Sequence, residues 1–205
     1  MQNPSIEDPI ATRVVEEEAL TGDELEAYVQ PRWYAAYTRA NHERRVADQL
    51  AQRSVQNFLP QYETVRKWKD RKVRLQMPLF PGYVFVHLAL QNRLHVLQVP
   101  GVAWLVSFGG RPVAVPEEEF ARIRGILEKG FRAEPHPYLT AGRRVRVRCG
   151  PFEGMEGIIV RRKNSSRLVI SLELIQRAMA VEISGFQLEP VARGFARDTF
   201  LSTQR

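Results

Sequence analysis

The sequence predicts an α+β fold in which an antiparallel sheet flanked by helices is followed by a small closed β-barrel. Between residues 31 and 130, short alternating apolar runs are interleaved with segments of helical periodicity. From residue 141 to residue 192 the apolar period is two almost throughout, in short strands separated by turns. Residues 131–140 contain two prolines and are expected to form a linker.

The first part of this plan begins with a strand and a helix. Residues 33–39 alternate as a strand, and apolar residues recur at helical spacing over 46–51, behind an N-cap expected at Asn41. Within residues 58–77, apolar and polar residues alternate on both sides of a basic turn. This pattern predicts a long hairpin with a positively charged tip.

The centre of the first domain is the stretch 78–86, where two prolines and a glycine precede an aromatic and β-branched run. The stretch is expected to form a sharp turn that leads into a strand starting at Tyr83. Both faces of that strand are apolar, which is typical of a central strand covered on two sides.

The remaining elements follow from the same patterns. Residues 94–99 predict a short helix, and residues 102–108 a strand with an extended return at Gly109. A helix should start at Pro116 and stop at Gly130, with acidic residues in its first turn. The barrel strands are expected within 145–183.

Charge is distributed unevenly along the chain. Residues 1–30 hold eight acidic side chains and one arginine, a net charge of −7, whereas residues 31–205 hold 29 basic and 15 acidic side chains, a net charge of +14. We expect residues 1–30 to be a disordered acidic arm and residues 193–205 a C-terminal tail. The basic body favours a polyanionic partner such as nucleic acid, and the alternative is a solvated surface without one.

Several functional classes find no support in the sequence. The one cysteine, Cys149, allows neither an intrachain disulfide nor a two-cysteine metal motif. Phosphate-loop, zinc-protease and nucleophile-elbow motifs do not occur, and the four histidines are scattered. We therefore expect a cytoplasmic protein that is not an enzyme, with no metal, no cofactor and no membrane association.

Two motifs resemble the NusG family of transcription elongation factors, over roughly residues 31–192. Residues 80–86 read Phe-Pro-Gly-Tyr-Val-Phe-Val, like the family signature, and Trp33-Tyr34 precedes them at a suitable distance. Residues 145–157 resemble a KOW motif with its glycine at Gly157. The resemblance implies an N-terminal NGN domain, residues 31–130, and an SH3-like KOW barrel, residues 141–192.

The resemblance also implies docking on the clamp helices of the largest RNA polymerase subunit. The matching aromatic positions here are Tyr37, Phe80, Tyr83 and Phe85. Docking of a helix on a sheet requires exposed apolar anchors. The alternative for each aromatic, Phe85 included, is packing in the core.

Contacts with DNA are implied for two arginines. Arg39 and Arg45 match positions that touch the non-template strand in specialised relatives, and guanidinium groups suit phosphates and base edges. The alternative is an ordinary solvated helix face. Residues 93–95 fall near the segment that approaches the polymerase β subunit in relatives.

In the KOW domain, the resemblance implies a docking surface for a small-subunit ribosomal protein or for Rho, at Phe152, Ile175 and Arg177. Residues 174–181 read Leu-Ile-Gln-Arg-Ala-Met-Ala-Val, whereas the housekeeping pattern is Ile-Phe-Gly-Arg-Ala-Thr-Pro-Val. This departure favours a specialised, RfaH-like or UpxY-like paralogue. The expected function is that of a monomeric elongation factor that suppresses pausing and acts in antitermination. The alternatives are a housekeeping factor that aids Rho-dependent termination and a ribosome-associated or RNA-binding KOW protein.

Overall fold

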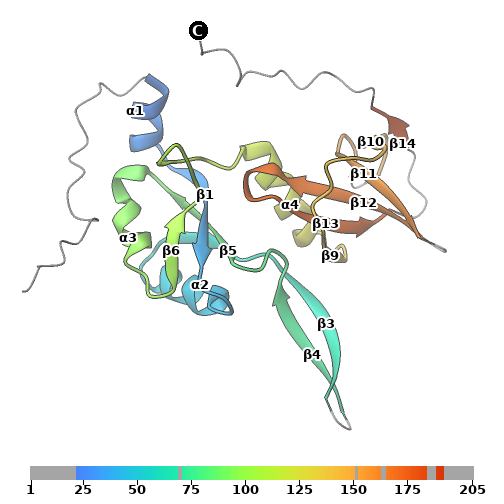
Figure 1. The fold of residues 1–205 in the computed structure, drawn as a ribbon, viewed down its shortest axis with the longest axis horizontal. Coiled ribbons are helices and arrows are strands. Elements are labelled where there is room, and N and C mark those ends of the chain that lie inside the picture. The colour runs from blue at the N-terminus through green and yellow to red at the C-terminus, as the bar shows by residue number, and fades with distance from the viewer. Residues whose placement is uncertain (1–21, 69–70, 151, 163–164, 184–187, 192–205) are drawn as a thin grey trace, which may run out of the picture.

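The computed structural model describes residues 22–68, 71–150, 152–162, 165–183 and 188–191. Its first domain is built on a four-stranded antiparallel sheet with the strand order β2-β5-β1-β6 (Figure 1). The strands are β1 (Arg32–Thr38), β2 (Gln56–Phe58), β5 (Tyr83–Leu88) and β6 (Val102–Leu105). The strand that starts at Tyr83 therefore lies inside the sheet, paired with β1 on one side and β2 on the other, as predicted.

Helices cover the two faces of this sheet. On one face, Val84 and Val86 pack with side chains of α2 (Glu43–Gln52) and of α3 (Arg93–Leu97), which follows a 3-10 turn at Leu90–Asn92. On the other face, Phe85 packs against Phe120 of α4 (Glu117–Glu128). The alternation of apolar residues along β5 is satisfied by helices on both sides.

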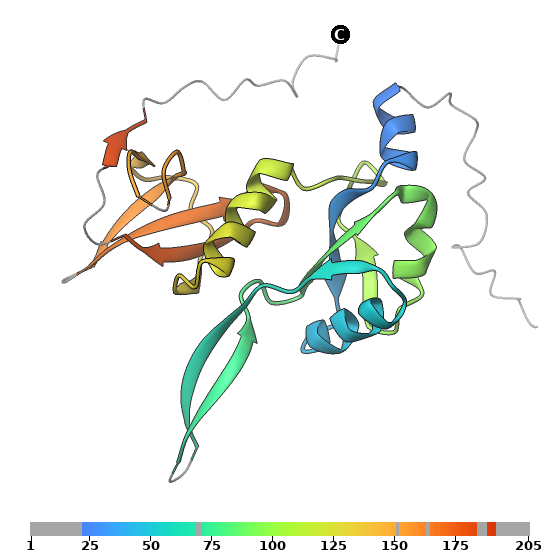
Figure 2. The same cartoon turned by 180° about the vertical axis from the view of Figure 1, so that it is seen from behind.

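Two hairpins leave this sheet. Strands β3 (Gln61–Trp68) and β4 (Arg71–Pro78) pair over eight positions and form a two-stranded sheet of their own, which projects from the body (Figures 1 and 2). The predicted hairpin is confirmed, and its tip residues 69–70 lie outside the described part. The strand expected over 102–108 is divided at Val106, and β7 (Ser107–Phe108) pairs with β8 (Arg111–Pro112).

The second domain is a six-stranded antiparallel sheet with the order β14-β10-β11-β12-β13-β9. Its strands are β9 (Ala133–His136), β10 (Arg144–Val147), β11 (Glu156–Arg162), β12 (Ser165–Leu172), β13 (Arg177–Glu182) and β14 (Leu188–Pro190), with a 3-10 turn at Glu173–Ile175. Gly157 is required in β11 because a Cβ there would lie 2.5 Å from the backbone oxygen of Val169. Among the described residues the edge strands β14 and β9 do not pair, so barrel closure stays a prediction.

The segment expected as a linker takes part in this sheet. Strand β9 lies within residues 131–140 and pairs with β13 from Ala133 to His136. Pro135 within the strand does not prevent this, because an edge strand tolerates a residue that lacks an N–H donor. The expected ten-residue linker was therefore wrong in its extent.

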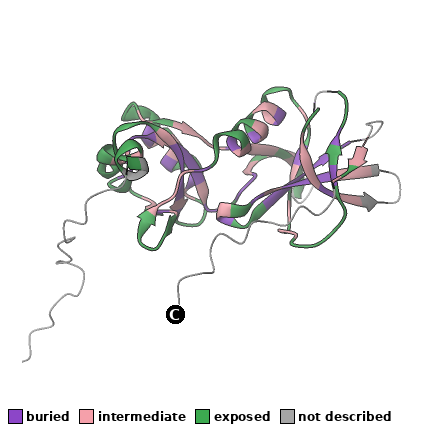
Figure 3. Ribbon diagram, turned by 90° about the horizontal axis from the view of Figure 1, so that it is seen from above, coloured by how far each residue is buried: buried purple, intermediate pink, exposed green. Residues whose placement is uncertain are grey.

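The two domains share one apolar core, in which α4 lies between the first sheet and the second domain (Figure 2). The ring of Phe120 stacks on Trp33 of β1 at 3.8 Å, and Phe131, just after α4, lies 4.3 Å from Phe152 of the second domain. Figure 3 shows buried residues running through the strands of both domains. In this structure the second domain is therefore docked on the first domain through α4.

Several termini differ from the sequence-based expectation. Helix α2 is capped by His42, because Asn41 adopts a positive φ of 61° that turns the chain before the helix. Pro116 caps α4 rather than opening it. Within the expected acidic arm, α1 (Gly22–Val29) forms a helix, and Glu26 pairs with Arg32 of β1 at 3.1 Å. The other arm residues and the tail expected over 193–205 lie outside the described residues.

Within the part of the chain that the structure describes, no helix has the length and apolar character needed to cross a bilayer.

Candidate functional site

Three aromatic side chains form a row across neighbouring strands of the first sheet. Tyr37 of β1 lies opposite Tyr83 of β5 and opposite Trp104 of β6. The Tyr37 ring packs edge to face with Tyr83 at 5.3 Å and stacks on Trp104 at 4.5 Å. Tyr37 and Tyr83 are half-buried, and Trp104 is 54% exposed. The row therefore presents an apolar surface on a rigid sheet, which suits docking of a partner helix.

Two of the four aromatics expected at this surface lie elsewhere. Phe80 and Phe85 are each 1% exposed and pack edge to face at 6.1 Å inside the core. Full burial of such a ring contributes about 1.5–3 kcal/mol to folding, which accounts for its place in the core. In this structure the two phenylalanines support the surface, while Tyr37 and Tyr83 present it.

The backbone conformation before Tyr83 requires a glycine at position 82. Its φ is +87°, and a Cβ there would lie 3.2 Å from Cε2 of Tyr37. Its N–H donates to Oε1 of the buried Glu43 at 2.8 Å, and its carbonyl accepts from the N–H of Thr38 at 2.8 Å. This turn connects the start of α2, the end of β1 and the start of β5, and so holds the two tyrosines together.

The two arginines expected to contact DNA lie just beyond the aromatic row. Arg39 follows the end of β1, two residues after Tyr37, and its backbone N–H donates to the carbonyl of Gly101 at 2.8 Å. Arg45 lies in the first turn of α2, and both side chains are exposed. The structure therefore places cations and aromatics near the same end of the sheet, separated by one short loop.

The residues expected to bind a partner in the second domain are divided between core and surface. Phe152 is 1% exposed and packs on Phe131, and Ile175 is 6% exposed. Arg177 is exposed, and its guanidinium lies over the ring of Tyr83 at 5.9 Å. The expected KOW docking surface is thus partly occupied by the first domain in this arrangement.

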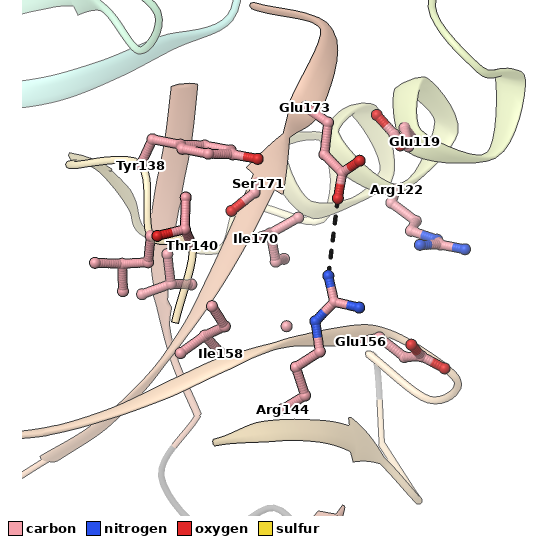
Figure 4. A pocket seen from close by; sticks show the side chains of 13 residues that line it. Glu119, Arg122, Tyr138, Thr140, Arg144, Glu156, Ile158, Ile170, Ser171 and Glu173 are labelled. Carbon is pink, nitrogen blue, oxygen red and sulfur yellow. Dashed lines mark ion pairs between the residues drawn. The ribbon is translucent and has the colours of Figure 1, made fainter. Parts of the chain in front are cut away.

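A polar cavity of about 370 Å³ lies where α4 meets the second domain (Figure 4). Glu119 and Arg122 face it from α4, and Arg144 forms an ion pair with Glu173 across it at 3.8 Å. Burial raises the pKa of the Glu119 carboxyl, and the charge of Glu173 raises it further, whereas Arg122 acts in the opposite direction. Oε2 of Glu119 is buried and has no hydrogen-bond partner among the described residues.

Sequence reasoning missed two members of the site. Trp104 was assigned to a strand, but its place beside Tyr37 depends on the register between β1 and β6, which shifts just after that pair. A large aromatic at the centre of a short strand was the only available signal. Glu43 was not singled out, because a glutamate in the first turn of a helix is ordinarily a solvated residue.

Comparison with known proteins agrees with the two motifs. Residues 31–124 match a family model described as transcription termination factor nusG. A Deinococcus radiodurans protein, the transcription termination/antitermination protein NusG, is 31% identical over 156 residues, covering 62% of this chain and 81% of the relative. The chain belongs to the NusG family. It is a transcription termination/antitermination factor of that family.

Other NusG proteins are similar over a longer part of the chain. The Vibrio cholerae protein is 29% identical over 172 residues, covering 77% of this chain and 94% of the relative. The Escherichia coli K12 protein is 28% identical over 172 residues, covering 77% and 95%. A solved structure described as "Domain interaction in Thermotoga maritima NusG" covers 74% of this chain and 93% of its own, with 23% identity and a TM-score of 0.48.

Proposed function

We propose that this NusG-family member is a non-enzymatic elongation factor that binds the clamp of bacterial RNA polymerase, suppresses pausing and acts in antitermination. The clamp helices of the largest subunit would dock on the row formed by Tyr83, Tyr37 and Trp104. The observation that carries the proposal is this row of partly exposed aromatics, held by a buried turn on a rigid sheet. Aromatic anchors of this kind dominate the binding free energy of many interfaces.

Two further contacts complete the proposal. Arg39 and Arg45 would meet the non-template DNA strand, and the exposed residues of α3 would approach the β subunit. Both arginines are exposed near the end of the sheet at which β1 ends, one residue after Tyr37. Their positive charge would steer the protein towards the transcription bubble and add little sequence preference unless base edges are reached.

The second domain would recruit a further machine, a small-subunit ribosomal protein or a termination factor, through Phe152, Ile175 and Arg177. Phe152 is buried and packs on Phe131, so its use by a partner would require this contact to open. The left-handed Gln176, where the housekeeping pattern has glycine, supports a specialised paralogue over a housekeeping factor that aids Rho.

Binding to a reconstituted elongation complex tests the docking surface. Tyr37→Ala combined with Tyr83→Ala, and separately Trp104→Ala, should each weaken binding by at least about tenfold, which is the loss expected of an interface hot spot. Phe108→Ala is the matched control, because Phe108 is an aromatic with 74% exposure outside the row. Circular dichroism would establish that each variant is folded.

The outcomes separate the parts of the proposal. Loss of binding in the row variants, with the Phe108 variant unchanged, supports the docking surface, and a run-off assay then gives the sign of the effect on pausing. Equal binding by folded row variants would overturn the surface. Wild type that fails to bind, with or without its native upstream DNA, would overturn the polymerase assignment itself.

A further inference from the structure

The β3–β4 hairpin forms a two-stranded sheet of its own and projects away from both domains along most of its length (Figures 1 and 2). Its strands pair only with each other, from Gln61 opposite Pro78 to Trp68 opposite Arg71. An eight-residue strand spans about 26 Å, and an isolated two-stranded hairpin is only marginally stable in water. Burial in a hydrophobic core therefore does not explain why the chain has this long arm.

Basic side chains are concentrated in the outer half of this arm. Residues 65–74 contain six lysines and arginines and one aspartate. In the register, Lys67 lies directly opposite Lys72, a like-charge pair that disfavours the hairpin. The ion pair between Arg74 and Glu63, at 3.7 Å and between exposed side chains, offsets little of this repulsion. The positive charges of Lys67 and Lys72 therefore lower the stability of the hairpin. Their presence indicates an anionic partner.

The cations occupy both faces of the ribbon. Because directly opposed residues share a face, Lys67, Lys72 and Arg74 lie on one side, and Arg66 and Arg71 lie on the other. All five side chains are exposed. A single anionic surface would meet only one of these faces, whereas a groove bordered by two phosphate backbones meets both.

We propose that the β3–β4 hairpin is a duplex-DNA-binding arm that lies in the major groove and contacts its two phosphate edges through Arg66, Lys67, Arg71, Lys72 and Arg74. The major groove of B-DNA is about 12 Å wide and admits a two-stranded ribbon, and its two edges are lined by phosphates. The major groove of A-form RNA is deep and narrow and does not admit such an element. This site is separate from Arg39 and Arg45, and it does not depend on polymerase binding.

The arm is tested without polymerase, with the full chain and a fluorescein-labelled B-DNA duplex followed by anisotropy across a salt series. Lys67→Gln combined with Lys72→Gln should weaken binding at least about tenfold and reduce the slope of log K against log salt by about 2, since each lost phosphate contact contributes about 0.9. The matched control, Arg53→Gln combined with Arg124→Gln, removes the same charge from the C-cap of α2 and from α4, and it should alter both quantities much less.

A second variant separates binding from folding. Lys67→Glu places opposite charges face to face across the ribbon, so it should support the hairpin while weakening DNA binding. Thermal unfolding would check that its stability is not reduced. A folded variant of this kind that still loses DNA affinity supports a direct electrostatic contact.

Three results would overturn the proposal. The hairpin variants could bind duplex DNA as tightly as wild type, or the control variant could lose as much as the hairpin variants, which would reduce the effect to net charge. An A-form RNA duplex of the same sequence, bound as tightly and with the same dependence on Lys67 and Lys72, would exclude insertion into the major groove. None of these results bears on clamp docking, which is measured with polymerase.

Discussion

The guanidinium of Arg177 lies 5.9 Å from the ring centroid of Tyr83. One residue belongs to the second domain and the other to the aromatic row of the first, so the domain contact reaches the proposed polymerase-docking surface. Ile175 is buried only two residues away. The contact between Arg177 and Tyr83 therefore joins the proposed polymerase-docking surface to one residue of the proposed partner surface in the second domain.

The first prediction concerns this contact. An exposed cation over a partly exposed tyrosine ring contributes about 0.5–1 kcal/mol, so Arg177→Ala should strengthen binding to the elongation complex by roughly two- to fivefold. Arg148→Ala, which removes an exposed arginine from the same domain, is the control. Titration of labelled elongation complex would measure the change. Weaker binding by the Arg177 variant would instead make this arginine a direct polymerase contact.

The second prediction concerns the turn beneath the tyrosines. Gly82→Ala forces a side chain onto a residue with φ of +87° and brings its Cβ 3.2 Å from Tyr37. The strain should lower the free energy of unfolding by about 1–3 kcal/mol and move the Tyr37 ring. Gly109→Ala separates the two causes, because Gly109 has φ of +58° and open space around its Cβ position. Urea denaturation would measure both variants, and equal losses would show that the contact with Tyr37 is irrelevant.

Much of this site could be predicted from local patterns, because its strands are specified by local residues. Alternation along 33–39 and 83–86 predicted the two strands that carry Tyr37 and Tyr83, and alternation along 58–77 predicted the hairpin. It could not decide that Phe85 is covered while Tyr83 stays half-exposed. The difference arises because α4 covers Phe85 and leaves Tyr83 partly uncovered. This packing joins residues that are far apart in the sequence.

Long-range geometry accounts for the other differences. Trp104 lies beside Tyr37 because β6 pairs with β1. Strand β9 is a strand because it pairs with the edge of β13. The contact between Arg177 and Tyr83 depends on the docking of two domains, which local sequence patterns do not predict. The sequence motifs identified the parts and their order, and tertiary packing selected which side chains remain at the surface.

The third prediction uses the departure at Gln176. This residue adopts φ of 49° and ψ of 46°, a left-handed conformation in which a side chain costs about 1–2 kcal/mol. Gln176→Gly should remove that strain, and part of the gain is offset because glycine loses more entropy on folding, leaving a net stabilisation of about 0.5–1 kcal/mol. Denaturant unfolding with an unchanged m-value would check it. Destabilisation would indicate that the Gln176 side chain makes a contact that holds the turn.

The fourth prediction concerns pH and the cavity beside α4. The pKa of Glu119 is raised by burial and by the charge of Glu173, so the folded chain binds the proton of this carboxyl more tightly than the unfolded chain does. The contribution of this proton to stability is therefore present at low pH, and it is lost as pH rises from the ordinary carboxyl range through the raised pKa. At neutral pH the charged group carries a desolvation penalty.

Glu119→Gln should consequently stabilise the chain at neutral pH and flatten its stability between mildly acidic and neutral pH. The amide keeps the shape of the side chain and cannot be ionised. Glu117→Gln is the matched control, because it makes the same change in the same helical turn at an exposed position. Both variants lose one favourable charge at the start of the helix, so their difference isolates the buried site. If unfolding curves measured across this range coincide for the two variants, the Glu119 carboxyl is not held in its protonated form by the fold.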